Sequence, residues 1–113
     1  MKEIILDTNF LLSCLKFKID FISEIKRISK FSYELCTLSG VLKELEGKKF
    51  GNLALQIIKD KKINIIGSED YVDNEILNLK GDYVIATNDR RLIKKLKFPV
   101  IRIKQKKYLI INV

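Results

Sequence analysis

Short runs of large apolar residues alternate along this chain with longer stretches in which apolar residues recur at helical spacing. The runs at residues 4–6 and 84–86 carry no polar residue on either face, as is typical of strands buried on both sides of a parallel sheet. Parallel neighbours need a crossover connection, and the helical stretches supply one each time. At 113 residues the chain is long enough to bury a core of its own. We therefore expect a single α/β domain over residues 1–113, with helices on both faces of a parallel sheet.

The same periodicity gives the order of the elements. It predicts strands at residues 2–7, 33–37, 63–66, 83–86 and 100–103, and helices within residues 11–28, 39–46, 52–58, 68–79 and 89–96. The strand at 63–66 is expected to be buried, and Ser68 is expected to cap the helix that follows it. Residues 108–113 form either a last edge strand or a segment that docks on a partner.

Two aspartates stand just beyond the ends of predicted buried strands. Asp7 directly follows the run at 4–6, and Asp89 follows the run at 84–86 after two polar residues. In open α/β sheets the ligand crevice lies outside the carboxyl ends of the strands, so both acids are candidates for one site. Glu44 and Asp73 lie on predicted helices, each separated from its neighbours by enough chain for a crossover back to the same edge. All four acids can therefore converge.

A cluster of four carboxylates has a definite chemistry. Such groups repel one another unless a cation neutralises them, and oxygen ligands without histidine suit Mg²⁺ or Mn²⁺. Each acid also has a structural alternative that the sequence leaves open. Asp7 can accept backbone N–H groups in a turn, Asp89 can cap the next helix, Glu44 can pair with Lys48, and Asp73 can complement a helix dipole.

The chain contains no histidine, and this absence excludes several mechanisms. A Ser-His-Asp triad, a His-Glu-x-x-His zinc site and metal-free RNA cleavage by paired imidazoles are all ruled out. Cys14 and Cys36 are too few for a structural zinc site, and we interpret both as small buried side chains, with a disulfide as the alternative. Hydrolysis by this chain therefore requires carboxylates, lysines, tyrosines or a metal.

The balance of 22 Lys plus Arg against 14 Asp plus Glu gives a formal charge of +8 and favours a polyanionic partner over a neutral one. Arg90, Arg91 and Lys94 lie beside Asp89 in the sequence, and Lys43 precedes Glu44, so these cations are candidates for contacts with the phosphates of such a partner. A solvated surface is the alternative. No apolar run reaches the length of about 18 residues that spans a bilayer, and no signal-peptide pattern is present, so we expect a cytoplasmic protein without a membrane partner.

Four segments together resemble the acidic motifs of the PIN domain family: IILDTNFLL at 4–12, VLKEL at 41–45, VDNEI at 72–76 and VIATNDRRL at 84–92. The resemblance implies a three-layer α/β/α sandwich and RNA cleavage by an activated water. It also implies that Asp7, Glu44, Asp73 and Asp89 bind Mg²⁺ or Mn²⁺. Asn9 and Thr87, within the first and fourth motifs, either orient the acids or serve ordinary turns. The closing stretch PVIRIKQKKY at 99–108 is similar to the branch that processes ribosomal RNA.

Two classes of function follow. The first is a metal-dependent endoribonuclease in which Asp7 or Asp89 helps to deprotonate the attacking water. Its role is ribosomal RNA processing or, since toxin-type PIN ribonucleases share the same acids, that of a toxin. The second is a non-catalytic RNA-binding or assembly protein. RNA is the expected partner in both classes, and a second copy of the chain, a ribosome-assembly factor or an antitoxin are further partners.

Overall fold

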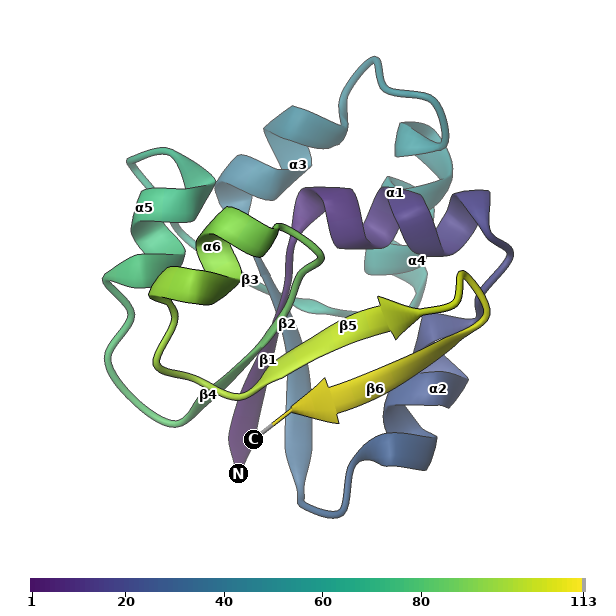
Figure 1. Ribbon diagram of the computed structural model, residues 1–113. Helices are drawn as coiled ribbons and strands as arrows, with labels where there is room; N and C mark the ends of the chain where they lie inside the picture. The colour runs from purple at the N-terminus through teal and green to yellow at the C-terminus, as the bar shows by residue number, and fades with distance from the viewer. Residues whose placement is uncertain (113) are drawn as a thin grey trace.

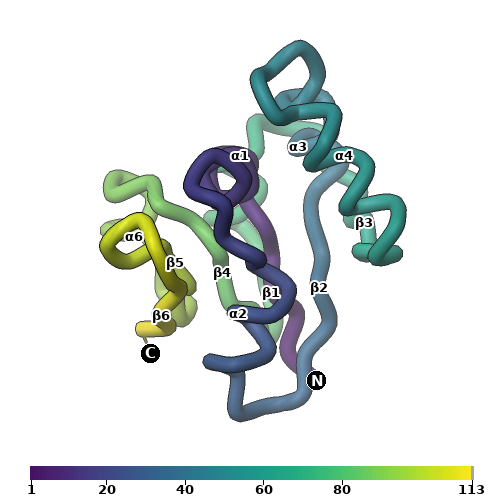
Figure 2. The backbone as a smooth tube through the Cα atoms, turned by 90° about the vertical axis from the view of Figure 1, so that its right-hand side faces the viewer, coloured from purple at the N-terminus to yellow at the C-terminus, as the bar shows by residue number. Residues whose placement is uncertain are grey.

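A computed structural model describes residues 1–112 of the chain, and within them six strands form one sheet in the order β3-β2-β1-β4-β5-β6. The strands are β1 (Lys2–Leu6), β2 (Tyr33–Leu38), β3 (Asn64–Ile66), β4 (Tyr83–Ala86), β5 (Val100–Lys104) and β6 (Tyr108–Asn112). Neighbouring strands are parallel from β3 to β5, and only β6 runs antiparallel to its neighbour. Figure 2 shows this order across the sheet.

Helices cover both faces of the sheet. They are α1 (Thr8–Lys16), α2 (Phe21–Ile28), α3 (Ser39–Leu45), α4 (Gly51–Asp60), α5 (Val72–Leu77) and α6 (Arg90–Lys95). Helices α1, α3 and α4 contact one another, and α5 contacts α6. Figure 1 shows the strands between α5 and α6 on one side and α1, α2 and α4 on the other. The α/β sandwich with a mostly parallel sheet is therefore confirmed.

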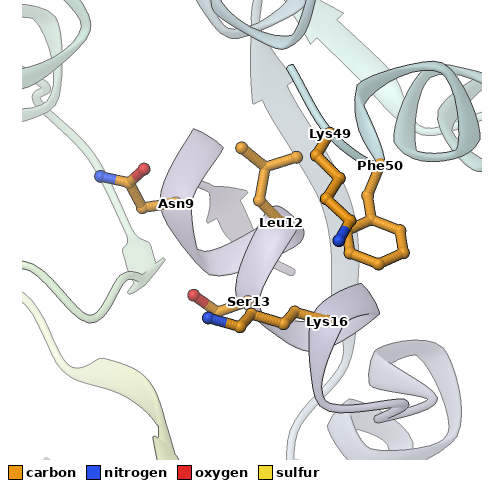
Figure 3. Close-up of a pocket in the computed structure, with 6 residues that line it drawn as sticks. All are labelled: Asn9, Leu12, Ser13, Lys16, Lys49 and Phe50. Atoms are coloured by element: carbon orange, nitrogen blue, oxygen red, sulfur yellow. The ribbon is translucent and has the colours of Figure 1, made fainter.

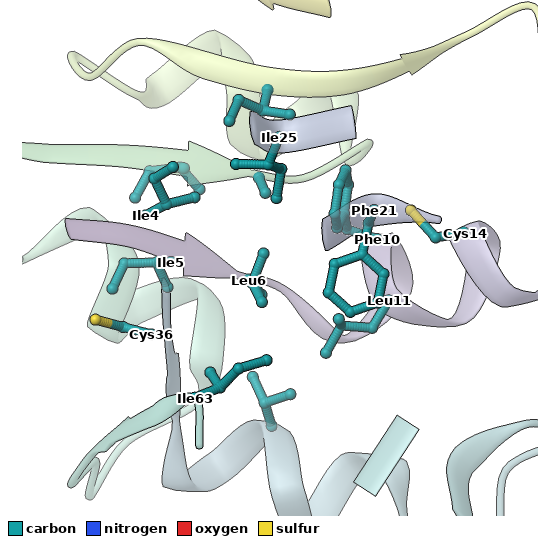
Figure 4. Close-up of a cluster of buried hydrophobic side chains, with 14 of the residues drawn as sticks. Ile4, Ile5, Leu6, Phe10, Leu11, Cys14, Phe21, Ile25, Cys36 and Ile63 are labelled. Atoms are coloured by element: carbon teal, nitrogen blue, oxygen red, sulfur yellow. The ribbon is translucent and has the colours of Figure 1, made fainter. Parts of the chain in front are cut away.

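The core forms where the apolar strands meet the inner faces of the helices. Ile4, Ile5 and Leu6 of β1 are fully buried, as the run without polar residues predicted. Both cysteines are buried free thiols, Cys36 beside Ile5 and Cys14 on α1 at the other end of the cluster (Figure 4). Burial raises the pKa of Cys14 to about 12 and that of Cys36 to about 11. The interpretation as small core side chains is confirmed, and the disulfide alternative is wrong.

Two local predictions are wrong. Strand β3 lies at the edge of the sheet with Asn64 and Ile65 exposed, whereas the apolar run at 63–66 predicted a buried strand. Ser68 does not cap the following helix, which begins at Val72 after Tyr71. Its hydroxyl oxygen instead accepts a hydrogen bond from the backbone N–H of Gly40 at 2.8 Å. Both errors arise because edge position and hydrogen bonding between distant segments leave no mark on local periodicity.

The last segment forms a strand rather than an unpaired extension. Residues Tyr108 to Asn112 pair with β5, and the backbone N–H of Leu109 donates to Glu24 of α2 at 3.0 Å. Val113, which belongs to the predicted segment 108–113, lies outside the described residues.

The strand order reverses its direction between β1 and β4, because the chain passes from β1 outwards to β3 and then returns to β4. Such a switch point opens a crevice at the carboxyl ends of the two strands. Asp7 and residues 87–89 follow these two ends directly. None of the helices in residues 1–112 is long and apolar enough to cross a membrane.

Candidate active site

Asp7 is fixed at the junction between β1 and α1. Its backbone N–H donates to the carbonyl oxygen of Ala86 at 3.0 Å, so pairing with β4 continues one residue beyond β1. Its carboxylate caps α1 by accepting the N–H of Thr8 at 2.9 Å. The residue is only 5% exposed. The sequence therefore places a carboxylate, otherwise costly to bury, where backbone donors hold it.

Thr87 links Asp7 to Asp89. The Thr87 side chain is fully buried, and its hydroxyl donates to the second carboxylate oxygen of Asp7 at 2.8 Å. The same hydroxyl accepts the backbone N–H of Asp89 at 3.2 Å. One carboxylate oxygen of Asp89 caps α6 by accepting the N–H groups of Arg91 at 2.9 Å and Leu92 at 3.1 Å. The two predicted strand-end acids thus share one buried hydroxyl, and each also caps a helix.

Glu44 reaches the same region from α3. Its side chain is exposed, and it accepts a hydrogen bond from the hydroxyl of buried Thr8 at 2.6 Å. No ion pair joins Glu44 to Lys48 within residues 1–112, so the predicted alternative for this acid is wrong. Thr8 thus contacts Asp7 through its backbone and Glu44 through its side chain. Its position directly after Asp7 was the only sequence signal for this role.

The negative charges of neighbouring acids affect the pKa values of Asp7 and Asp73. Burial raises the pKa of Asp7 from 3.8 to about 6, the hydrogen bonds from Thr87 and Thr8 oppose the rise, and the negative charges of Asp73 and Glu44 add to it. The pKa of Asp73, on α5, is also raised, first by burial and then by the charges of Asp89 and Glu44, while Lys95 lowers it. Asp73 therefore lies within electrostatic range of the other three predicted acids.

The four acids lie near the carboxyl ends of β1 and β4 but do not form a compact set of metal ligands. Within the described part of the chain, no three acidic or cysteine side chains lie close enough to hold one metal together. Among the hydrogen bonds of residues 1–112, Asp73 takes part through neither carboxylate oxygen, and Asp89 and Glu44 each use only one. The oxygens without hydrogen bonds are open to a cation, and each oxygen of Asp7 accepts one hydrogen bond and keeps a second lone pair.

Predicted phosphate-contacting residues lie on the helices that carry the acids. Lys43 is exposed on α3 next to Glu44, and Arg90, Arg91 and Lys94 are exposed on α6. The cations therefore flank the carboxylates, as the sequence predicted.

A pocket of about 390 Å³ lies along α1, where exposed Asn9 contributes to one wall and Phe50 to another. Figure 3 shows Asn9 pointing away from Phe50, on the other side of the helix. Lys49 lies over the Phe50 ring, with its ammonium nitrogen 5.5 Å from the ring centroid. Phe50 adopts a left-handed backbone with φ of 69°, a conformation that costs energy for a residue other than glycine. Asn9 thus contributes to the lining of this pocket on the side of α1 away from Phe50, and none of the hydrogen bonds in residues 1–112 joins its side chain to the acids.

Comparison with known proteins agrees with this geometry. The chain is 38% identical to ribonuclease VapC4 of Methanocaldococcus jannaschii over 125 aligned residues, which cover 96% of this chain and 95% of the relative. The structure of the PIN domain endonuclease Utp24 superimposes with a TM-score of 0.84 at 25% identity, covering 97% of this chain and 90% of that one. No family model matches the sequence. The strand order, the acids at the switch point and these two relatives lead to one conclusion: the chain belongs to the PIN domain family.

Proposed function

We propose that this chain is a Mg²⁺- or Mn²⁺-dependent endoribonuclease, with Asp7, Glu44, Asp73 and Asp89 as its metal-binding and catalytic residues. The observation that carries the proposal is the hydrogen-bonded link from Asp7 through Thr87 to Asp89 at the switch point of the sheet. The relatives named ribonuclease and PIN domain endonuclease support the same activity.

The donor set fits a hard divalent cation. All candidate ligands are carboxylate oxygens, and the sequence holds no histidine. Burial is the main cause that raises the pKa values of Asp7 and Asp73, and the negative charges of neighbouring acids add to the rise; a bound cation would favour the charged carboxylates against both effects. We assign direct binding to the free oxygens of Asp73, Asp89 and Glu44 and to the remaining lone pairs of Asp7. When bound, a divalent ion polarises a phosphoryl oxygen and lowers the pKa of a coordinated water.

We assign proton transfer, orientation of the carboxylates and phosphate binding to residues of the chain. Asp7 or Asp89 accepts the proton of the attacking water, whose oxygen bonds to phosphorus while one P–O ester bond breaks and the departing sugar oxygen takes up a proton. Thr87 and Thr8 fix the orientation of the carboxylates. Lys43, Arg90, Arg91 and Lys94 hold neighbouring phosphates without reading bases.

For the substrate we propose ribosomal RNA, on the resemblance of residues 99–108 to the branch of the family that processes it. The alternative is a toxin-type ribonuclease. Cleavage confined to ribosomal RNA fragments within a mixed panel supports the first role, whereas a partner protein that abolishes cleavage when added supports the second.

The test is cleavage of labelled RNA by purified protein with Mn²⁺, with Mg²⁺ and with chelator, beside Asp7→Asn and Asp82→Asn. Asp82 lies before β4, at the opposite end of that strand from Asp89, and pairs with Lys2, so its substitution is a matched control. We expect metal-dependent cleavage that falls by at least about 100-fold in Asp7→Asn, the scale of losing an electrostatic group in an active site, and persists in Asp82→Asn.

Equal activity in all three preparations would reveal a contaminating nuclease and contradict the proposal. RNA binding without cleavage, unchanged by metal or by Asp7→Asn, would favour the non-catalytic RNA-binding class. One observation supports that class: within residues 1–112, no three acidic side chains lie close enough to bind one metal ion together.

A further inference from the structure

A second pocket, of about 430 Å³, lies next to the acids on the side of β5. Asn88 and Arg90, the residues on either side of Asp89, contribute to its lining, as do Arg102 of β5 and the turn between β5 and β6. The side-chain oxygen of Asn88 accepts the backbone N–H of Ile103 at 2.9 Å. This hydrogen bond ties the loop that carries Asp89 to β5, so the pocket keeps a fixed position relative to the site.

The pocket is strongly cationic. Arg90, Arg102 and Lys106 line it, no acidic residue does, and none of the three forms an ion pair within residues 1–112. The Nε atom of Arg102 is buried and has no hydrogen-bond acceptor in the described structure. Buried guanidinium N–H groups normally have partners, so an unpartnered one beside two other cations indicates that an anion completes the pocket.

The turn that closes the pocket has an unusual composition. Gln105 and Lys106 have φ angles of 53° and 55°, and the N–H of Lys107 donates to the carbonyl oxygen of Lys104 at 3.1 Å. Type I′ hairpin turns require this left-handed pair, and asparagine followed by glycine is the usual choice. Here two long polar side chains occupy the positions instead, at a cost in backbone strain.

The strained turn directs Lys106 towards the pocket. Figure 1 shows the β5–β6 turn beside the end of α1. The ammonium nitrogen of Lys106 lies 5.5 Å from the ring centroid of Phe17, which follows α1 and also lines the pocket. Backbone strain of this kind is found at ligand sites, so the conformation of the turn agrees with a binding role for Lys106.

We propose that this pocket binds a backbone phosphate of the RNA substrate next to the one that is cleaved, with Arg102 and Lys106 as the principal contacts. The inference rests on the proposed function. A phosphodiester presents two non-bridging oxygens, which match the planar fork of a guanidinium, and its charge suits the three cations. The pocket positions the chain of phosphates relative to Asp89 and is not part of the reacting centre.

The test is the salt dependence of affinity for a labelled single-stranded RNA, measured with the full chain in chelator so that binding is separated from cleavage. The variants are Lys106→Gly, Arg102→Gln, Arg102→Lys and Lys62→Gly. Lys62 is the matched control, since it is an exposed lysine with φ of 52° before β3, at the opposite edge of the sheet.

Each lost phosphate contact lowers the slope of log affinity against log salt by about 0.7 for a single strand, which is about 2.6-fold in affinity between 50 and 200 mM salt. We expect this change in Lys106→Gly and Arg102→Gln but not in Lys62→Gly. Arg102→Lys keeps the charge and loses the fork, so its affinity falls with little change in slope. Both glycine variants relieve left-handed strain but raise the entropy of the unfolded chain, so we expect both to melt near the parent temperature. Weaker binding by Lys106→Gly with such a melting temperature would not reflect unfolding.

Two outcomes would overturn the inference in distinguishable ways. If the parent binds RNA while Lys106→Gly and Arg102→Gln keep its affinity and slope, or change only as much as Lys62→Gly does, the pocket does not hold a phosphate and the proposed nuclease stands. An acidic protein partner for the pocket would give this result. If the parent neither binds nor cleaves RNA, the proposed function fails first and the subsite fails with it.

Discussion

Replacing Asp7 with asparagine is expected to stabilise the metal-free protein at the same time as it abolishes cleavage. The Asp7 carboxylate is nearly fully buried at 5% exposure, and Asp73 and Glu44 repel its charge. Asparagine has the same shape, caps a helix as well as aspartate does, and carries no charge. The substitution therefore removes an electrostatic penalty while it preserves the start of α1.

The size of this penalty follows from the pKa of Asp7. A rise from 3.8 to about 6 corresponds to about 3 kcal/mol of unfavourable free energy for the charged form in the folded state. Against this, the asparagine amide cannot accept both hydrogen bonds that Thr8 and Thr87 now donate, a loss of about 1 kcal/mol. The variant should therefore be more stable than the parent by about 2 kcal/mol above pH 7, the difference between these two figures.

The dependence on pH has a definite sign. An aspartate with a raised folded pKa binds its proton more tightly when the protein is folded, so its contribution to stability is full below pH 3.8 and is lost as the pH rises through about 6. The greater stability of Asp7→Asn should thus appear at pH 8. Near pH 4 the difference should disappear, or the parent should be more stable by about 1 kcal/mol. Subtracting the unfolding free energy of the parent from that of the variant at each pH cancels the contributions of all other titrating groups.

The assay is urea unfolding in chelator at pH 4, 6 and 8, with Asp82→Asn as the control. Asp82 is exposed and pairs with Lys2 on the surface, so its substitution should cost less than about 1 kcal/mol at each pH. An Asp7→Asn protein that is less stable than the parent at pH 8, or equally stable at all three values, would refute the reasoning. Adding Mn²⁺ should narrow or reverse the difference, because the parent, with all four carboxylates, then gains more stability from binding than the variant does.

Two further predictions concern buried groups. Thr87→Val removes the hydroxyl shared by Asp7 and Asp89, so we expect unfolding to be easier by about 1–3 kcal/mol and cleavage to fall about 10- to 100-fold, measured by urea titration and by RNA cleavage. Unchanged cleavage would show that the hydroxyl does not orient the acids. Burial raises the pKa of Cys14 to about 12 and that of Cys36 to about 11, so neither thiol should react with a disulfide reagent at pH 8 until urea unfolds the protein. Rapid labelling of the native protein would contradict this.

The α/β class and the approximate positions of β1 to β5 could be predicted from the amino-acid sequence, whereas β6 was one of two alternatives for residues 108–113. Local periodicity carried most of this, because a short run such as Ile4 to Leu6, with no polar residue on either face, is typical of a strand buried on both sides of a sheet. It also placed Asp7 and Asp89 at strand ends, because both acids follow apolar runs directly or within three residues. The metal-binding roles of these acids stay predictions.

The hydrogen bonds that hold the acids, and the pocket beside them, could not be predicted from local sequence. The link through Thr87, the contact from Thr8 to Glu44, the use of Ser68 against Gly40 and the pocket formed around Arg102 all join residues far apart in the chain. Such contacts depend on which strands become neighbours and on which face each helix packs. The order of strands, β4 beside β1 rather than beside β3, is set by burial over the whole sheet, and no local pattern of residues carries it.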